Sequence, residues 1–434
     1  MPVEVIGFIG IIVMFVLMAI RVPIAIAMMV PAIIGIYYIR GWDAVSTSLH
    51  TIVWNQTSSY TLATIPMFIL MGQLLYISGI SSELFNMFRV WTGSLRGGLG
   101  IATVGASAIF SAASGSSLAN TGTMGVVASK EMLNSGYDKS LSAGAIIAGG
   151  TLGILIPPST AFIVYGLITE VSIGKLLIAG IIPGIILALL YMITIYVSVL
   201  IKPQFGPAVE KTSWKEKFSS FKSIYSIALL FILVIGGMYF GLFTPTEAAG
   251  VGAFGALVIG LIRRRITLKS FITALNSTLT TTSFIFAIVV GAFILSYFMV
   301  LTKIPTYLSD FLTSTNLSTL GILMLIVLMY IILGAVMDSL SMIVVTLPII
   351  LPTLVALEVD LIWFGVIVVL LIEMAMITPP IGMLCFVLND VAPEMGGLNT
   401  IFKGALRFVI PLVIMIVLLF IFPTLALFLP SSSF

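Results

Sequence analysis

The chain has 434 residues, of which 60% are hydrophobic and only 8% are charged; its mean hydropathy is +1.25 and its formal net charge +3. Soluble globular proteins carry about 25% charged residues, so this composition excludes a set of water-soluble domains. The single Cys385 and the single His50 exclude internal disulfides and sites built from paired cysteines or histidines. We interpret Cys385 as an apolar filler and His50 as an interfacial loop residue. The basic residues form no cluster with interleaved aromatics, so nothing indicates nucleic-acid binding.

The apolar residues form long stretches, several of which reach the roughly 20 residues that a helix needs to cross a bilayer. In chain order these stretches cover 5–20, 22–39, 61–78, 98–128, 141–168, 176–201, 223–242, 246–262, 270–301, 319–356, 361–389 and 407–429. No basic segment and cleavage site precede the first stretch, so we expect a retained spanning helix there rather than a signal peptide. The pattern predicts an all-α polytopic membrane protein.

Two pairs of prolines indicate a tandem repeat. Pro23 and Pro245 each open the second apolar stretch of a half, and they are 222 residues apart. Pro157 and Pro379 each begin a Pro-Pro pair inside a stretch, and they are also 222 residues apart. We therefore expect a first repeat over 1–201, a linker over 202–222 and a second repeat over 223–434.

The stretches at 98–128 and 319–356 are each divided by a polar kink, which predicts two re-entrant helical hairpins. The remaining stretches then give about ten full spans, five in each repeat, so the second repeat is inverted relative to the first. With the N-terminus outside, every Lys and Arg except Arg40, Lys175 and Lys303 falls inside, together with the central linker. The positive-inside rule favours this topology, and inverted repeats with hairpins are typical of transporters.

Each repeat pairs a hairpin tip with a span broken by Pro-Pro, over 141–168 and 361–389. Two prolines in mid-membrane remove two N–H donors and open the helix, which leaves carbonyl oxygens that need a partner. A bound Na⁺ would satisfy them, because it is a hard cation that prefers oxygen ligands. The predicted Na⁺ ligands are Ser111, Gly153, Ile156 and Pro157 in the first repeat and Gly334, Ala375, Thr378 and Ile381 in the second.

Helix N-termini that point into the same cavity favour an anionic group of the substrate. The residues predicted to bind that group are Ser116, Ser117, Asn120, Asp338, Ser339 and Ser341. Kinking by proline and close packing by small residues offer a structural explanation for each motif taken alone. Two matched pairs of tip and broken span favour transport.

The acidic residues near these motifs have several interpretations. Asp338 lies at the second hairpin tip, where a carboxylate could coordinate Na⁺, carry a proton or hold the tip by accepting N–H bonds. Glu373 precedes the opening of the second broken span by about one turn, and its role is open. Glu247 belongs to Thr244-Pro245-Thr246-Glu247, which predicts a capping box with proline at the first helical position.

Longer motifs accompany these residues: PMFILMGQLLYISGI at 66–80, SAASGSSLANTGTMG at 111–125, GYDKSLSAGAIIAGGTLGILIPPSTAFIVYG at 136–166, AGIIPGIILALL at 179–190, FTPTEAAGVGAFGAL at 243–257 and ITPPIGMLCFVL at 377–388. They resemble the large permease subunit of the TRAP transporters, the tripartite ATP-independent periplasmic transporters, over essentially the whole chain. The resemblance implies an elevator-type transporter in the cytoplasmic (inner) membrane of a bacterium or archaeon. It implies Na⁺-driven uptake of an organic anion, mostly a carboxylate, with Na⁺ bound at the eight positions named above.

The resemblance also implies two protein partners. One is a small four-helix membrane subunit, expected as a separate chain because Met1 opens directly on the first span. The other is a periplasmic binding protein that delivers the substrate. The sequence departs from the family pattern at Ala375, where glycine is usual, and at Glu373, where an uncharged residue is usual. The added carboxylate leaves the ion stoichiometry open.

Two alternatives stay open at this point. One is a self-sufficient Na⁺/carboxylate symporter that needs no binding protein. The other is a membrane-embedded serine hydrolase that uses Ser116, which would need a base although His50 is far away in sequence. No Walker lysine loop is present, so we expect no ATP hydrolysis by that route, no enzyme activity and no organic cofactor. The identity of the anion and the oligomeric state are not predicted.

Overall fold

The computed structural model describes residues 1–208, 212–222, 224–314, 317–334 and 337–433. Within these ranges the chain forms helices and short connections, with no β-strand, which confirms the predicted all-α class. Several predicted segments extend beyond the described residues: 209–211 of the linker, 223 at the start of the second repeat, and 335–336 at the second hairpin tip.

The first half contains eleven α-helices. They are α1 (Val3–Ala19), α2 (Ile24–Arg40), α3 (Trp42–Thr57), α4 (Thr64–Ile77), α5 (Ile80–Thr92), α6 (Gly98–Ser114), α7 (Ser117–Asn134), α8 (Lys139–Thr151), α9 (Thr160–Thr169), α10 (Ile173–Ala179) and α11 (Ile181–Ile201). Short 3₁₀ turns join some of them, at η1 (Tyr60–Ala63), η2 (Leu152–Ile154) and η3 (Pro203–Phe205).

The linker carries α12 (Trp214–Phe221), and the second half follows the same plan as the first. Its helices are α13 (Tyr225–Tyr239), α14 (Pro245–Ile262), α15 (Leu268–Leu301), α16 (Ile304–Ser314), α17 (Thr319–Gly334), α18 (Ser339–Ala356), α19 (Leu361–Ile377), α20 (Met383–Val391), α21 (Leu398–Ala405), α22 (Val409–Ile421) and α23 (Thr424–Ser432). The 3₁₀ turns are η4 (Pro393–Met395) and η5 (Leu406–Phe408).

The order of elements is similar in the two halves, with one difference. Helix α2 follows Pro23 and α14 begins at Pro245, and the helix pairs α6–α7 and α17–α18 each precede a span that contains a cis Pro-Pro bond. The 34-residue α15 occupies the place that α3, η1 and α4 share in the first half, so one half has a continuous helix where the other is interrupted.

Six described helices are long and apolar enough to cross a membrane, or up to seven if α12 and α13, which meet at a 47° bend, form one span. Further apolar helices of 10–17 residues include α1, α2 and α19. Helix α18 meets the same length criterion although the sequence predicts it as a hairpin arm, so length alone does not distinguish an arm from a span. The chain is therefore a multi-pass membrane protein, and the total of about ten spans stays a prediction.

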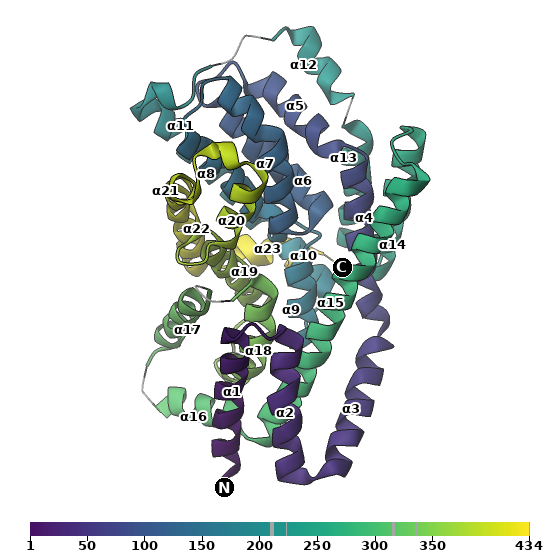
Figure 1. Cartoon of the computed structure of the whole chain (residues 1–434), viewed down its shortest axis with the longest axis vertical. Helices are drawn as coiled ribbons and strands as arrows, with labels where there is room; N and C mark the ends of the chain where they lie inside the picture. The colour runs from purple at the N-terminus through teal and green to yellow at the C-terminus, as the bar shows by residue number, and fades with distance from the viewer. Residues whose placement is uncertain (209–211, 223, 315–316, 335–336, 434) are drawn as a thin grey trace.

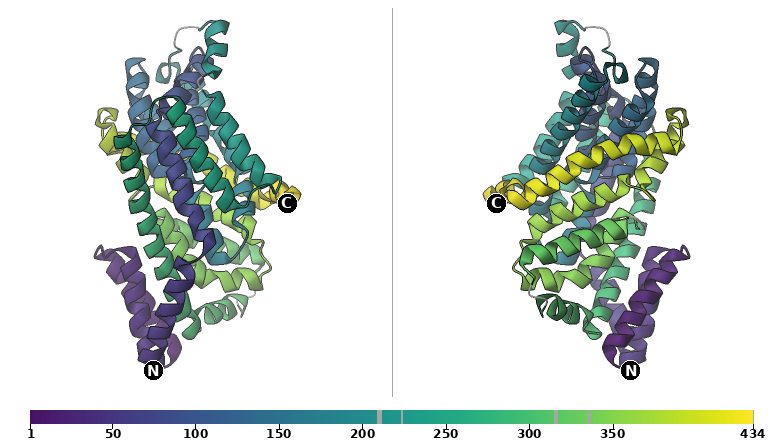
Figure 2. Two further views of the ribbon diagram at one scale, coloured as in Figure 1. Left: turned by 90° about the vertical axis from the view of Figure 1, so that its right-hand side faces the viewer. Right: turned by 90° about the vertical axis from the view of Figure 1, so that its left-hand side faces the viewer.

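Helix α4 packs on α14 and α15, and α2 packs on α15. The hydroxyl groups of Thr64 and Thr246 hydrogen-bond at 2.8 Å between α4 and α14, and Arg263 forms an ion pair with Glu83 at 2.6 Å. The hairpin helices pack on the broken spans, α6 and α7 on α8 and α17 on α19. Helix α12 and the N-terminus lie at opposite ends of the molecule (Figures 1 and 2).

Several amphipathic helices escaped the sequence analysis, which followed continuous apolar stretches. They are α3, α5, α12, α16 and α21. The expected loop around His50 is wrong, because His50 lies on the exposed face of α3. The linker is partly helical and docks on α5, where the Trp91 indole N–H donates to the Lys217 carbonyl at 3.2 Å. Two local predictions are confirmed: Cys385 is buried, and Thr244 with Glu247 forms the capping box of α14.

Candidate functional site

The first hairpin tip joins α6 to α7 and rests on the first broken span. Gly115 turns the chain with a φ of +58°, and a Cβ atom there would lie 2.8 Å from the Pro158 carbonyl oxygen. The Thr160 hydroxyl donates to the Gly115 carbonyl at 3.1 Å. Ser116 then caps α7 by accepting the Ala119 N–H at 3.4 Å. The tip is therefore held against the residues that follow the Pro-Pro pair.

The first broken span opens where the Pro-Pro pair predicts. Helix α8 ends at Thr151, η2 follows, and Ser159 caps α9 by accepting the Phe162 N–H at 3.2 Å. A Cβ atom on Gly153 would lie 2.7 Å from the backbone of Ser116, so only glycine permits this approach of span and tip. The carbonyls of Ile156 and Pro157 accept no backbone hydrogen bond from the described residues. They are thus available to a cation.

Asn120 fastens three helices together beneath the first tip. Its buried side-chain amide donates to the Ser107 carbonyl at 3.2 Å, the Ser111 hydroxyl at 2.9 Å and the Gly149 carbonyl at 3.2 Å. These bonds connect α6, α7 and α8. Asn120 is predicted to bind the substrate; in the structure its side chain makes these bonds between helices, and Asn120 is not among the residues that line the cavity described next.

The second hairpin tip rests on the second broken span in a similar way. Asp338 caps α18 by accepting the Ser341 N–H at 3.2 Å, and the Ser339 hydroxyl contacts the Met376 sulfur at 2.7 Å. A Cβ atom on Gly334 would lie 2.1 Å from the Cβ of Ala375. Gly334 and Ala375, both predicted Na⁺ ligands, are therefore in direct contact.

The second broken span opens after α19. The Thr378 N–H and hydroxyl both bond the Ala375 carbonyl, at 3.2 and 3.3 Å, so these groups close the end of α19. Gly382 precedes α20, and the carbonyls of Thr378 and Ile381 accept no backbone hydrogen bond within the described part of the chain. The opening therefore exposes carbonyl oxygens, as it does in the first half.

Glu373 connects the second half to the first hairpin tip. The residue is fully buried on α19, and its Oε1 accepts a hydrogen bond from the Ser117 hydroxyl at the start of α7. Its Oε2 has no hydrogen-bond partner among the described residues, and neither of the ion pairs found there involves it. The sequence placed Glu373 near the second opening but did not predict its contact with Ser117, 256 residues away.

A cavity of about 270 Å³ lies between the two tips. Its wall includes the N-terminal residues of α7, α9 and α18, and residues of α4 and α15. The lining residues are Ile69, Gln73, Ser114, Ser116, Ser117, Leu118, Ala119, Ile154, Thr160, Ala161, Thr281, Phe284, Ile285, Asp338, Ser339, Leu340 and Met376. Because helix N-termini carry unpaired N–H groups and the positive end of the dipole, three of them at one cavity favour an anionic group.

Two neighbouring cavities share parts of this wall. One of about 350 Å³ shares Gln73 and Ser114, and another of about 430 Å³ shares Phe284 and Asp338. The three cavities therefore follow the boundary between the hairpins and helices such as α1, α2, α4 and α15. Ser341, predicted to bind substrate, lines the 430 Å³ cavity and not the central one.

The structure brings together four of the predicted substrate-binding residues in the central wall: Ser116, Ser117, Asp338 and Ser339. Sequence reasoning missed Gln73 and Thr281, which reach the cavity from α4 and α15. A polar side chain in an otherwise apolar span was the signal available for Gln73. Among the described residues, no group of three or more His, Cys, Asp or Glu side chains could hold a metal ion. The donors around the tips are hydroxyl, carbonyl and carboxylate oxygens, which suit a hard cation.

Residues 11–425 match the family described as the tripartite ATP-independent periplasmic transporter, DctM component. The chain is 34% identical to a C4-dicarboxylate TRAP transporter large permease protein of Pseudomonas aeruginosa over 88% of this chain and 89% of that protein. It is 32% identical to the sialic acid large permease protein SiaM of Vibrio cholerae, over 86% of this chain and 87% of that protein. It is also 32% identical to the sialic acid permease protein SiaT of Haemophilus influenzae, over 98% of this chain and 68% of that protein.

Two solved transporters share the fold. The YdaH transporter of Alcanivorax borkumensis superposes with a TM-score of 0.60 at 16% identity, over 90% of this chain and 88% of that one. MtrF of Neisseria gonorrhoeae, from a class of antimetabolite efflux pumps, superposes with a TM-score of 0.61 at 15% identity, over 96% of this chain and 95% of that one. The fold is that of a polytopic transporter, and the match over 11–425 shows that the chain belongs to the DctM family, as a large permease subunit of the TRAP transporters.

Proposed function

We propose that this subunit carries an organic carboxylate into the cell, driven by a Na⁺ gradient, through the cavity between the two hairpin tips. The observation that carries the proposal is the meeting of three helix N-termini, those of α7, α9 and α18, at one cavity. The hydroxyls of Ser116, Ser117 and Ser339 lie in the same wall and can donate hydrogen bonds to a carboxylate. The names of the relatives, for C4-dicarboxylates and sialic acid, agree with a carboxylate cargo.

Asp338 makes a cation necessary in this scheme. Its carboxylate lies in the wall of the same cavity, where it would repel an anionic substrate. Na⁺ bound close to both anions removes that repulsion, so the substrate and Na⁺ favour each other's binding. The Na⁺ ligands in this proposal are Ser111, Gly153, Ile156 and Pro157 at the first opening and Gly334, Ala375, Thr378 and Ile381 at the second.

We further propose an elevator motion, in which the hairpins and broken spans move as one block along α2, α4, α14 and α15. The three cavities along that boundary support this division. The shared order of elements in the two halves supports inverted repeats over 1–201 and 223–434 with about ten spans in total. In this topology the N-terminus is outside, the linker is cytoplasmic, and the membrane is the bacterial or archaeal inner membrane.

The proposal includes the two partners typical of a tripartite system. A periplasmic binding protein delivers the substrate from outside, and a small membrane subunit covers part of the lipid-facing surface. Some relatives are longer than this chain, which spans 68% of SiaT and 54% of an isethionate permease protein of Oleidesulfovibrio alaskensis. A self-sufficient symporter, which needs no binding protein, remains the alternative, and the experiment below distinguishes it from the tripartite scheme.

The test is uptake into proteoliposomes that contain the chain and its small subunit. Radiolabelled carboxylates are supplied with or without an inward Na⁺ gradient and with or without the cognate binding protein. We expect uptake only when both are present. Uptake with Na⁺ alone would replace the tripartite scheme with the self-sufficient symporter, and uptake that is indifferent to Na⁺ would overturn the coupling.

A further inference from the structure

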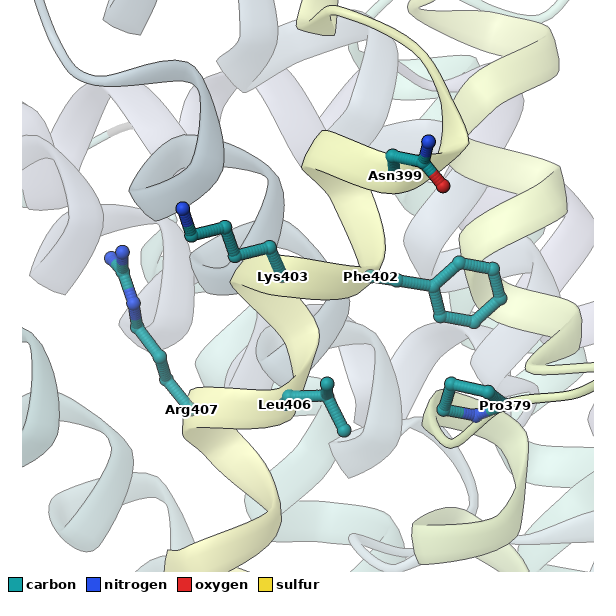
Figure 3. Close-up of a pocket in the computed structure, with 6 residues that line it drawn as sticks. All are labelled: Pro379, Asn399, Phe402, Lys403, Leu406 and Arg407. Carbon is teal, nitrogen blue, oxygen red and sulfur yellow. The ribbon is translucent and has the colours of Figure 1, made fainter.

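A basic pocket is lined by residues of α21 and η5, and it is separate from the cavity between the tips. It has a volume of about 650 Å³. Its lining residues are Pro379, Asn399, Phe402, Lys403, Leu406 and Arg407, none of which lines the central cavity. Figure 3 shows Lys403 and Arg407 extending to one side of the helix, while Phe402 lies on the other side near Pro379. The residues that line the pocket therefore combine two cations with apolar side chains.

Among the described residues, the positive charge of this region has no acidic partner within ion-pair distance. The Arg407 guanidinium lies 5.0 Å from the centroid of the Phe205 ring, and the Lys202 ammonium lies 5.2 Å from the same centroid. Arg407 Nη1 is buried and has no hydrogen-bond acceptor within the described residues. The ion pairs found in the described ranges, Arg89–Glu131 and Arg263–Glu83, do not involve Lys202, Lys403 or Arg407. A buried guanidinium N–H without an acceptor favours an added anion.

An apolar stripe begins at the pocket and continues along α22. Leu406, which lines the pocket, is 47% exposed, and Ile410 on the next turn is 64% exposed. The stripe continues at helical spacing through side chains that are 42–60% exposed: Val413, Ile414, Val417 and Ile421. Residues 409–421 carry no charge, so the boundary between charged and apolar surface falls at Arg407. A basic end followed by an apolar face matches the anionic headgroup and the acyl chain of a phospholipid.

We propose that this pocket binds an anionic phospholipid, with the headgroup phosphate on Lys403 and Arg407 and an acyl chain along the α22 stripe. Arginine suits the phosphate because its planar fork donates two hydrogen bonds to two oxygens. The stripe favours a lipid over a free anion, because a phospholipid can occupy the pocket and the adjoining stripe together, whereas a soluble phosphate would use the pocket alone. The pocket also includes Pro379, so the bound lipid lies beside the second broken span.

The test measures lipid binding and does not depend on transport. Purified protein is titrated with phosphatidylglycerol or phosphatidylcholine, and bound lipid is counted by native mass spectrometry. We expect phosphatidylglycerol to bind at least about tenfold more tightly than phosphatidylcholine. The double variant Lys403→Gln, Arg407→Gln should lose that preference. The matched control Arg264→Gln, Arg265→Gln removes two exposed cations elsewhere and should keep it.

Two further arms keep the result decisive. If the double variant folds poorly, the single variants Arg407→Lys and Arg407→Gln are compared instead. Arg407→Lys retains the charge, so we expect it to weaken lipid binding less than Arg407→Gln does. Inorganic phosphate at millimolar concentration should not displace the lipid. Equal binding of the two lipids, loss of preference in the control, or full displacement by phosphate would each overturn the proposal, the last by showing a site for a soluble anion.

Discussion

The two hairpin tips have the same plan but different chemistry. Ser116 caps α7 with a neutral hydroxyl, whereas Asp338, 222 residues later, caps α18 with a carboxylate. Asn120 holds the first tip with three hydrogen bonds, and the residue 222 positions later is Met342, a buried apolar side chain. The first tip is thus held by hydrogen bonds and the second by a charged cap and apolar packing.

The two halves also differ in the charge that they bring to the tips. Both core carboxylates, Asp338 and Glu373, come from the second half, and Glu373 extends across to Ser117 of the first tip. The first half supplies neutral donors and a hydrogen-bonded frame, while the second half supplies negative charge. In the proposed cycle, both halves supply oxygen ligands to Na⁺ and hydroxyl donors to the carboxylate, and the second half adds the negative charge. The following variants test what each tip contributes.

The largest effect is expected for Asp338→Asn. Asparagine can still cap α18, so the tip keeps its fold while the negative charge in the cavity wall is removed. A lost cation contact of a few kcal/mol would lower Na⁺-driven uptake by about 100-fold. Asp360→Asn is the matched control, because Asp360 caps α19 in the same manner but lies outside the cavity. Full activity of Asp338→Asn would leave the carboxylate only its capping role.

Gly153→Ala should come next. Its Cβ atom would meet the Ser116 backbone at 2.7 Å, and backbone atoms cannot move aside as a flexible side chain can. We expect the first tip to shift and uptake to fall by about tenfold or more at normal expression. Gly250→Ala is the control, since no atom lies within 4 Å of a Cβ atom there. If both variants transport equally, the contact between tip and span is not needed for uptake.

Asn120→Leu tests the hydrogen-bonded frame of the first tip. The side chains are similar in size, but leucine removes the donor for three buried acceptors. We expect a loss of about 2–4 kcal/mol in the free energy of unfolding, read as a lower thermal midpoint in detergent. Val126→Ala, at an exposed position on the same helix, should change the midpoint little. An unchanged midpoint in Asn120→Leu would show that these bonds do not hold the tip.

The smallest effect is expected for Thr378→Ala. The hydroxyl of Thr378 donates to the Ala375 carbonyl and closes the end of α19, while the Thr378 carbonyl accepts no backbone hydrogen bond within the described residues, so we expect Na⁺ to bind the carbonyl. The Na⁺ concentration for half-maximal uptake should change by less than about threefold. A much larger increase would show that the hydroxyl itself binds the ion.

The local architecture was largely predictable from the sequence. The Pro-Pro pairs fall in the breaks between α8 and α9 and between α19 and α20, and the first polar kink contains the break between α6 and α7. Prolines and glycines act on their own turn, so their effect is visible in the local sequence. The amphipathic α3 and α5 were missed because their polar faces interrupt the apolar run on which span prediction depends.

The contacts between distant segments were not predictable in this way. Ser117 and Glu373 meet across 256 residues, and no period or motif in either segment indicates the other. Asn120 is predicted to bind substrate because it stands in a Ser-rich tip, and the sequence did not indicate that its amide donates to groups of α6 and α8. Which face of a helix meets a neighbour depends on packing, and packing is decided by the whole fold.

The most direct test of the account asks whether the two tips share one substrate site. Single cysteines replace Leu118 at the first tip and Leu340 at the second, in a background with Cys385→Ser, and their labelling by a polar thiol reagent is measured. We predict that one transported carboxylate protects both cysteines, and only in the presence of Na⁺. A cysteine at exposed Ser46 on α3 should label equally under all conditions. Protection of one tip alone, or protection without Na⁺, would contradict a shared Na⁺-dependent site.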